Sequence, residues 1–250
     1  LRIKYTKITK EQIQNKKAHK DNQYFYKRTE EIKQFYSNDF LGGHPGFAHL
    51  VHIVHDTKTN SDVYLLDYNA CKNGFINKYI QNANNDQFST ENNTEIQALL
   101  VRIAKSILDA HTKNIVLRDI SFSNVGLDSN NNPVIVSLAP SCKIGEVAPL
   151  LSPAPFLCPP EVKLILKSNP QTNINDLTYE IKPEQDIYVF GALILMLTGG
   201  KFNTIGFSLR TFAPPPTFIP VMPKHESEPV RNLISSMLSA NPEDRPTIGT

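Results

Sequence analysis

The sequence predicts an α+β fold, with a small β-rich N-terminal part and a larger helical C-terminal part. Two observations support this prediction. Residues 1–67 contain three short strand-like runs around one helical pattern. Residues 68–250 contain longer stretches with helical spacing of apolar residues, separated by short β-branched runs and proline-rich loops.

The composition limits the classes of protein to be considered. The 250 residues are 40% hydrophobic and 20% charged, which is ordinary for a globular protein with a sizeable core. The net charge of +2 is spread along the chain, so a nucleic-acid partner is not expected. The longest apolar run, Ile187–Leu197, is too short to span a bilayer and predicts a buried helix.

The three cysteines are odd in number and lack metal-ligand spacing, which indicates a reducing intracellular compartment. The chain begins at Leu1 without a methionine or a signal-like segment. We therefore expect that it is a piece of a longer protein.

The N-terminal elements are expected in the order strand, helix, strand, strand. Leu1–Tyr5 alternates apolar and polar residues, as a half-buried strand does. A charged helix is expected over Asn22–Phe40, closed by Gly42 and Gly43. Strands are expected at His49–His55 and Asp62–Leu66, on either side of a turn.

A helix is expected to lead into the centre of the chain. A short helix at Phe75–Ile80 and an exposed asparagine-rich loop at Asn82–Asn93 should precede it. Thr94 is the expected N-cap, and apolar residues on one face continue the helix to His111.

Short strands and further helices should follow. The expected strands are Ile115–Leu117 and a hairpin of Val125–Leu127 with Pro133–Val136. The expected helices are a buried one from Asp186 to Leu197 and an amphipathic one over Val230–Ala240, and a proline-rich loop is expected at Phe212–Pro223.

A polar loop follows the run Ile115–Leu117. It places Asp119 and Asn124 five positions apart before the apolar run resumes at Val125. An aspartate can orient or deprotonate a hydroxyl group, while an asparagine downstream can hold a metal ion. The spacing therefore predicts a catalytic loop.

Four segments resemble motifs of eukaryotic-type protein kinases, in the order in which that family has them. The segments are Leu117–Asn124 (H-R-D-L-x-x-x-N), Pro159–Glu161 (A-P-E), Asp186–Gly191 (D-V-Y-S-F-G) and the closing motif Asn241–Pro246. The resemblance implies a bilobal kinase fold, truncated at both ends. Residues 1–67 would be a partial small lobe without its first two strands, and residues 68–250 would be the large lobe.

The resemblance also implies a nucleotide site with ATP as the cofactor. Lys4 aligns with the lysine that holds the ATP phosphates, and Glu31 aligns with its partner glutamate. Leu66 would lie at the back of the adenine pocket, and the backbone from Asp67 to Asn69 would form the hinge. The alternative interpretation is a solvated lysine on an edge strand and a surface glutamate.

The large lobe is expected to contain two further contacts of the family. Glu161 should form an ion pair with Arg245, and Asp186 should cap its helix and hydrogen-bond the catalytic-loop backbone. Segment Pro140–Pro160 corresponds to the activation segment. Its prolines predict a loop with a preset conformation.

The sequence departs from the family at three chemically important positions. Ser137–Ala139 stands where D-F-G is expected, so Ser137 replaces the metal-binding aspartate and only Asn124 remains of the expected metal ligands. A neutral hydroxyl is a weak ligand for Mg²⁺, so we expect that Mg²⁺ binds poorly. Ser121 replaces a lysine that contacts the γ-phosphate, and Leu117 replaces the histidine.

Three hypotheses for the function therefore remain open. The first is a pseudokinase that binds protein partners and ATP but has impaired phosphotransfer. The second is an active atypical serine/threonine protein kinase with protein substrates, in which Asp119 and Asn124 act with another acid, Glu146 or Asp128. The third is a structural scaffold whose nucleotide cleft is closed by apolar residues such as Leu138.

Overall fold

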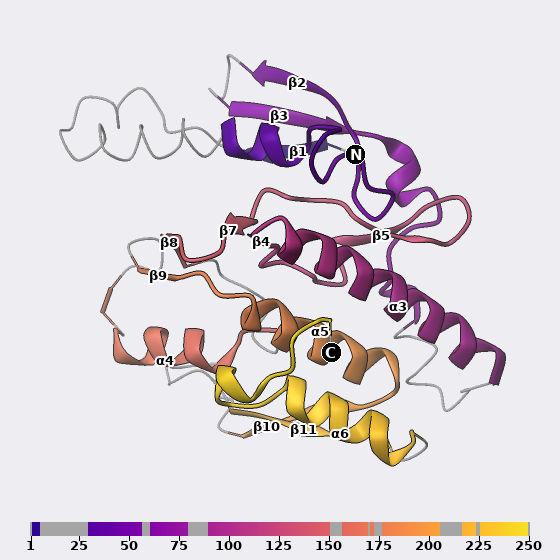
Figure 1. Ribbon diagram of the computed structural model, residues 1–250, viewed down its shortest axis with the longest axis vertical. Coiled ribbons are helices and arrows are strands. Elements are labelled where there is room, and N and C mark those ends of the chain that lie inside the picture. The colour runs from indigo at the N-terminus through magenta and orange to yellow at the C-terminus, as the bar shows by residue number, and fades with distance from the viewer. Residues whose placement is uncertain are drawn as a thin grey trace. The chain divides into compact units, whose positions relative to one another are not determined.

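A computed structural model of the chain describes residues 2–5, 30–56, 61–79, 90–150, 157–169, 171–172, 177–205, 217–223 and 226–249. Most of the turn expected at Thr57–Ser61 and most of the loop expected at Asn82–Asn93 lie outside these ranges. The described elements are short antiparallel sheets followed by helices, which confirms the α+β prediction (Figure 1).

The chain separates into two compact units, and each unit is made of two stretches of the sequence. Unit 1 comprises Leu1–Phe75 and Val125–Ala139, and unit 2 comprises Ile76–Asn124 and Pro140–Thr250. The division expected between residues 67 and 68 stays a prediction about domains. Backbone packing groups residues 68–75 and 125–139 with the N-terminal stretch.

Unit 1 is built on a three-stranded antiparallel sheet. In spatial order its strands are β1 (Arg2–Tyr5), β3 (Ser61–Leu66) and β2 (Leu50–Asp56). Lys4 of β1 lies opposite Val63 of β3 in the register. All three strands were predicted from the sequence pattern, with boundaries that differ by one residue.

The helix expected at Asn22–Phe40 is described over residues 30–35. Its Ile32 and Phe35 side chains are buried in unit 1. The helix ends earlier than predicted because serine, asparagine and aspartate follow, and these residues favour turns. The first part of the predicted helix, residues 22–29, lies outside the described residues.

The second stretch of unit 1 is the predicted β-hairpin. Its strands are β5 (Val125–Leu127) and β6 (Pro133–Ile135). Asp128 organises the turn, because its carboxylate accepts hydrogen bonds from the backbone N–H groups of Asn130 and Asn132, both at 2.8 Å. The Ile135 N–H donates to the Gly46 carbonyl at 2.8 Å, which joins the hairpin to the N-terminal stretch.

Unit 2 contains the larger helices and three two-stranded antiparallel sheets. Its helices are α3 (Thr90–Thr112), α4 (Pro160–Ser168), α5 (Glu184–Leu197), α6 (Glu228–Met237) and the 3-10 helix η4 (Pro242–Asp244). Its sheets pair β4 (Ile115–Val116) with β7 (Cys142–Lys143), β8 (Val147–Pro149) with β9 (Thr178–Glu180), and β10 (Lys201–Ile205) with β11 (Thr217–Val221).

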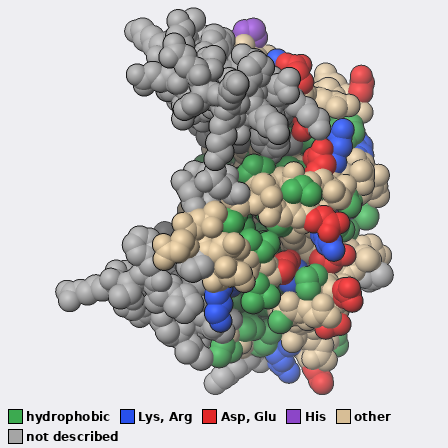
Figure 2. Space-filling model, turned by 90° about the vertical axis from the view of Figure 1, so that its left-hand side faces the viewer, with side chains coloured by type: hydrophobic (Ala, Val, Ile, Leu, Met, Phe, Trp, Pro, Cys, Tyr) green, Lys and Arg blue, Asp and Glu red, His purple; other side chains and the backbone are tan. Residues whose placement is uncertain are grey.

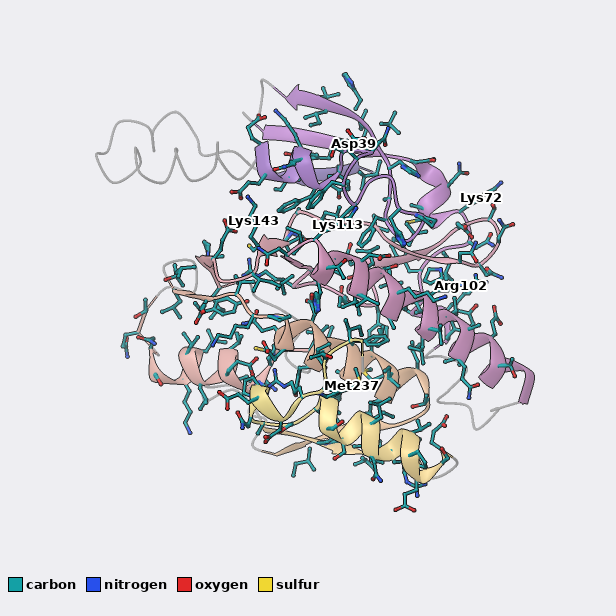
Figure 3. The ribbon with its side chains drawn as sticks, in the orientation of Figure 1. Asp39, Lys72, Arg102, Lys113, Lys143 and Met237 are labelled. Carbon is teal, nitrogen blue, oxygen red and sulfur yellow. The ribbon has the colours of Figure 1, made fainter. Side chains whose placement is uncertain are left out.

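Helix α5 forms the core of unit 2. Nearly all of its residues are buried, as the long apolar run predicted. α6 packs closely on it, since a Cβ atom at Gly191 would lie 2.7 Å from the Met237 Cβ. Met237 is labelled in Figure 3. The glycine therefore permits a close approach of the two helices.

Helix α3 begins four residues before the expected cap. Thr94 lies inside the helix, which starts at Thr90. The buried Tyr79 hydroxyl donates a hydrogen bond to the Glu95 carboxylate beside the first turns. This tertiary contact stabilises the helix close to residues 90–93, which were predicted as loop and are helical. Of the helix expected at Phe75–Ile80, residues 78–79 are helical.

Strand β11 lies within the segment predicted as a proline-rich loop, so that prediction was wrong for Thr217–Val221. Pro220 is opposite Phe202 of β10 in the register. Each strand of a two-stranded sheet has a free edge, where a residue without an N–H group is tolerated.

The expected ion pair of unit 2 is present and is bidentate. Arg245 Nη1 is 2.8 Å from Glu161 Oε1, and Arg245 Nη2 is 2.7 Å from Glu161 Oε2. The Arg245 guanidinium lies 5.1 Å from the centre of the Tyr188 ring. The pair joins α4 to the chain beyond η4.

The exposed large apolar side chains are distributed over several elements of the described surface. In Figure 2, acidic and basic side chains are interspersed with apolar ones on the face shown. The most exposed large apolar side chains are Val51, Val147 and Leu164, which lie on three different elements. Among the described helices, none is both long and apolar enough to cross a membrane.

We predict that the protein loses stability at alkaline pH. Burial raises the pKa of the Cys158 thiol from 9.0 to about 12 and the pKa of the Tyr188 hydroxyl from 10.0 to about 12. Between these values the unfolded chain binds fewer protons than the folded one, so the unfolding free energy falls as pH rises. The fall should approach about 1.4 kcal/mol per pH unit for each group.

Urea unfolding between pH 8 and pH 11.5, with a reducing agent, measures this slope. Cys158→Ala should flatten the slope above pH 9. Cys71→Ala is the comparison at a half-buried thiol, whose pKa burial also raises, and it should flatten the slope less. Equal slopes for the wild type and Cys158→Ala would contradict the prediction.

Candidate functional site

The predicted catalytic loop is held by one buried carboxylate of unit 2. Asp186, in the first turn of α5, is fully buried. Its Oδ2 accepts a hydrogen bond from the Leu117 N–H at 2.7 Å, and its Oδ1 accepts one from the Arg118 N–H at 2.8 Å. The Nε2 atom of His111, in the last turn of α3, lies 3.0 Å from Oδ2. The expected bond between Asp186 and the loop backbone is confirmed.

The expectation that Asp186 caps its own helix was wrong. The N-cap residue of α5 is Pro183, and it makes no side-chain capping hydrogen bond. Both Asp186 carboxylate oxygens instead accept hydrogen bonds from the loop. A proline and an aspartate near the start of a helix are compatible with an aspartate that caps the helix and with one that binds another segment. The sequence pattern alone therefore did not distinguish these two roles.

The structure brings Asp119 and Asn124 together. The Asn124 side-chain amide donates to the Asp119 carbonyl at 2.7 Å, and the Asn124 N–H donates to the Ser121 carbonyl at 2.9 Å. The Asp119 carboxylate accepts from the Ser121 N–H at 3.2 Å. Asp119 is only partly buried, so its carboxylate can meet a substrate hydroxyl. This arrangement suits an aspartate that orients or deprotonates a hydroxyl group.

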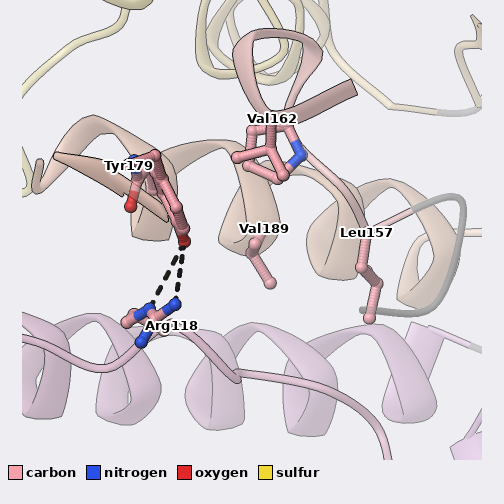
Figure 4. A pocket seen from close by; sticks show the side chains of 7 residues that line it. Arg118, Leu157, Val162, Tyr179 and Val189 are labelled. Carbon is pink, nitrogen blue, oxygen red and sulfur yellow. Dashed lines mark hydrogen bonds between the residues drawn. The ribbon is translucent and has the colours of Figure 1, made fainter. Parts of the chain in front are cut away.

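Arg118 connects the catalytic loop to the expected activation segment. Its backbone has a φ of 66°, and its guanidinium donates to the carbonyls of Pro140 at 3.2 Å and Pro149 at 2.6 Å. It also donates to the Tyr179 hydroxyl at 3.2 and 3.3 Å, as the dashed lines in Figure 4 show. The Tyr179 oxygen accepts these bonds through its lone pairs, and burial raises the pKa of its hydroxyl. No sequence pattern signals this contact, because Arg118 and Tyr179 are 61 residues apart in the chain.

A cavity of about 20 Å³ lies beside this arginine, with Tyr179, Gln185 and Val162 among its lining residues (Figure 4). It is large enough for a single water molecule but far too small for a nucleotide. The buried Gln185 Oε1 has no hydrogen-bond partner among the described residues. The cavity therefore belongs to the structural support of the loop.

Two residues predicted at the phosphate site lie in unit 1. Lys4 is on β1, and its side chain is outside the described residues. Glu31 is in the helix over residues 30–35, where it is partly buried. Their assignment to a lysine–glutamate pair stays a prediction. The neighbouring Lys33 pairs with Glu30 at 2.6 Å.

The expected hinge residues also lie in unit 1. Leu66 is buried at the end of β3, and Asp67 caps the 3-10 helix η2 (Tyr68–Cys71). The Asp67 N–H donates to the His49 carbonyl at 2.9 Å, and the Asp67 carboxylate accepts from the Asn69 N–H at 2.9 Å. Both N–H groups therefore bind acceptors within the unit. Adenine contacts by Leu66, Asp67 and Asn69 stay a prediction.

Ser137 lies two residues after β6 of the β5–β6 hairpin, and its assignment to the metal-binding position stays a prediction. The Ser137 Oγ accepts from the Ala139 N–H at 3.4 Å. Leu138 is completely buried, and Ala139 is nearly so. This segment is neutral and largely apolar.

The donor set does not fit a magnesium ion well. The two positions expected to hold the metal supply a neutral amide, Asn124, and a neutral hydroxyl, Ser137, whereas Mg²⁺ prefers carboxylate and phosphate oxygens. Of the two substitute acids considered, Asp128 binds its own turn and Glu146 accepts from the Lys143 N–H at 3.1 Å. Within the described ranges, no three His, Cys, Asp or Glu side chains are grouped as metal ligands.

Comparison with known proteins identifies distant relatives among protein kinases. No protein-family model matches the sequence. The chain is 27% identical to the probable serine/threonine-protein kinase nek3 of Dictyostelium discoideum over 65% of its length, and 24% identical to the serine/threonine-protein kinase PLK4 of Nematostella vectensis over 82%. It is also 24% identical to sperm motility kinase 2B of Mus musculus over 83% of its length. The matches span 14%, 19% and 39% of these three relatives, respectively.

We predict that Asp186→Asn destabilises the protein by about 3 kcal/mol. An amide has one acceptor oxygen, so at least one of the Leu117 and Arg118 N–H groups would lose its partner inside the protein. Urea unfolding measures the change. The exposed Asp244→Asn is the control and should stay within about 0.5 kcal/mol of the wild type. Similar small effects for both variants would show that the buried carboxylate is not an anchor.

Proposed function

We propose that this distant relative of serine/threonine protein kinases is a pseudokinase domain that binds ATP and protein partners but transfers phosphate poorly. The observation that carries the proposal is the neutral segment at Ser137–Ala139, where active relatives of the resembled family place a metal-binding aspartate. Fold inheritance alone can retain the other motifs, so the altered site decides the function.

The chemistry supports impaired transfer. Phosphoryl transfer depends almost entirely on positioning and on stabilisation of the charge that spreads over the transferring group. Ser137 replaces one charged group near that centre, and Ser121 replaces another. Removing a single preorganised electrostatic contact costs an enzyme about 10²–10³ in kcat. The loss of both should cost several orders of magnitude.

The catalytic loop itself supports a second candidate function, an active atypical kinase. Asp119 and Asn124 are in contact, and Asp186 holds the loop as in a working enzyme of the resembled family. This candidate requires a carboxylate that replaces the missing one. Asp128 is a poor substitute because three donors of its own turn, from Asn130 and Asn132, already occupy its two oxygens.

The third candidate, a scaffold that binds no nucleotide, is supported by the burial of Leu138 and Ala139 within unit 1. It shares with the first candidate a role in protein binding. We further propose a reducing intracellular environment, which the free thiols of Cys71, Cys142 and Cys158 support.

A thermal-shift titration with ATP, with and without Mg²⁺, distinguishes the candidates. We expect that ATP stabilises the wild type equally with and without Mg²⁺, by about 2.7 kcal/mol when its concentration is 100 times its Kd. Ser137→Asp should make the stabilisation increase with Mg²⁺, because it restores a hard anionic ligand. Ser129→Asp adds the same charge in the exposed hairpin turn and should leave the Mg²⁺ response unchanged.

A phosphotransfer assay with radiolabelled ATP completes the test, with Asp119→Ala as the background. Wild-type activity at that background supports the pseudokinase. Mg²⁺-dependent transfer that Asp119→Ala abolishes would establish the active kinase instead. No stabilisation of the wild type by ATP under either condition would favour the scaffold.

A further inference from the structure

A buried tyrosine hydroxyl of unit 1 binds the backbone on both sides of Ser137. The Tyr36 hydroxyl donates to the Val136 carbonyl at 3.0 Å and accepts from the Leu138 N–H at 2.9 Å. Tyr36 is 4% exposed, and Leu138 is fully buried. One oxygen atom therefore contacts two backbone groups separated by a single residue.

Both contacts are strong because water is excluded from them. A buried tyrosine hydroxyl needs hydrogen-bond partners, and here the segment 136–138 supplies both a donor and an acceptor. The Tyr36 ring packs against the buried Tyr64 ring, with 6.3 Å between the ring centres. The backbone of Tyr36 is restrained as well, because its N–H donates to the Ile32 carbonyl. The hydroxyl thus occupies a defined position in the unit.

The geometry constrains the residue between the two contacts. Fixing the Val136 carbonyl and the Leu138 N–H restricts the peptide groups on either side of Ser137, and burial of the Leu138 side chain restricts them further. A side chain held on a restricted backbone points in a defined direction. The Ser137 Oγ accordingly accepts from the Ala139 N–H nearby.

We propose that Tyr36 is the positioning residue for position 137: its hydroxyl sets the backbone that directs this side chain. The role of position 137 in metal binding rests on the function proposed above, but the backbone constraint does not. Tyr36 itself contacts neither substrate nor metal in this proposal. It acts through the backbone of its neighbours.

Amide hydrogen exchange, followed by NMR on the whole chain, tests the constraint directly. Tyr36→Phe removes only the hydroxyl, so the Leu138 N–H loses its acceptor and should exchange about tenfold faster or more. The Ile135 N–H, which donates to the Gly46 carbonyl, should keep its rate and report the stability of the unit. Tyr64→Phe, which removes the same atom from the neighbouring buried ring, should leave Leu138 unchanged.

Two results would overturn the proposal. The Leu138 exchange rate could be the same in Tyr36→Phe and the wild type, or the Leu138 and Ile135 rates could rise by the same factor. The first result would show that the hydroxyl does not hold the segment. The second would show that Tyr36 contributes only to general stability.

A double-mutant cycle tests the consequence for the site. In the Ser137→Asp background, Tyr36→Phe should weaken the Mg²⁺-dependent stabilisation by ATP about tenfold in apparent Mg²⁺ affinity, whereas Tyr64→Phe should not. If Tyr36→Phe leaves this affinity unchanged, Tyr36 does not position residue 137. If Ser137→Asp produces no Mg²⁺ response at all, the proposed function fails, and the exchange rates still decide the role of Tyr36.

Discussion

The buried carboxylate of Asp186 is the interaction on which the loop of unit 2 depends. A charge without solvent contact is tolerated only when hydrogen-bond donors replace the water, and here two consecutive backbone N–H groups and a histidine surround it. The donors come from the end of α3 and from the loop, while the carboxylate comes from α5. The charge thus requires three separate chain segments to meet at one point.

Arg118 extends this constraint from the loop into the segment that follows. Its N–H binds Asp186, and its side chain binds the carbonyls of Pro140 and Pro149. The acceptors are neutral, so the arginine charge is solvated by dipoles and by the Tyr179 hydroxyl. The preset conformation expected from the prolines therefore has a second physical cause in a single guanidinium group.

The surroundings of Asp119 and those of Leu138 differ in polarity. Around Asp119 the contacts are polar hydrogen bonds to Ser121 and Asn124. Around Leu138 the surroundings are apolar and neutral, and a tyrosine hydroxyl fixes the backbone. Both arrangements stabilise the fold, so retention of the polar loop does not by itself establish the function of the site.

Local sequence patterns predicted the elements whose causes are local. The β5–β6 hairpin follows from turn-forming residues such as Asp128, and α5 follows from its continuous apolar run. The patterns failed where distant residues decide the outcome. The Tyr79 contact with Glu95 accompanies the earlier start of α3, and pairing with β10 makes a strand of the segment around Pro220.

The residues of the candidate site also divide into those that the local sequence predicted and those whose roles depend on distant contacts. Spacing and resemblance were enough to select Asp119 and Asn124 and to place Ser137 just after the hairpin. These residues lie within a few positions of one another or of a predictable hairpin. The roles of Tyr36 and Tyr179 could not. A tyrosine carries no sequence signal that tells which backbone groups its hydroxyl will bind a hundred residues away.

The interleaving of the two units has a consequence for synthesis of the chain. Unit 1 lacks its β5–β6 hairpin until residue 139 has been made, roughly sixty residues after Phe75. At ribosomal speeds of about 5–20 residues per second, that interval lasts about 3–12 s. During it, the backbone of Gly46 and Ala48, which later binds Ile135, has no native partner from that strand. An expression fragment that ends near residue 75 would therefore leave the Gly46 carbonyl and the Ala48 N–H without these native partners.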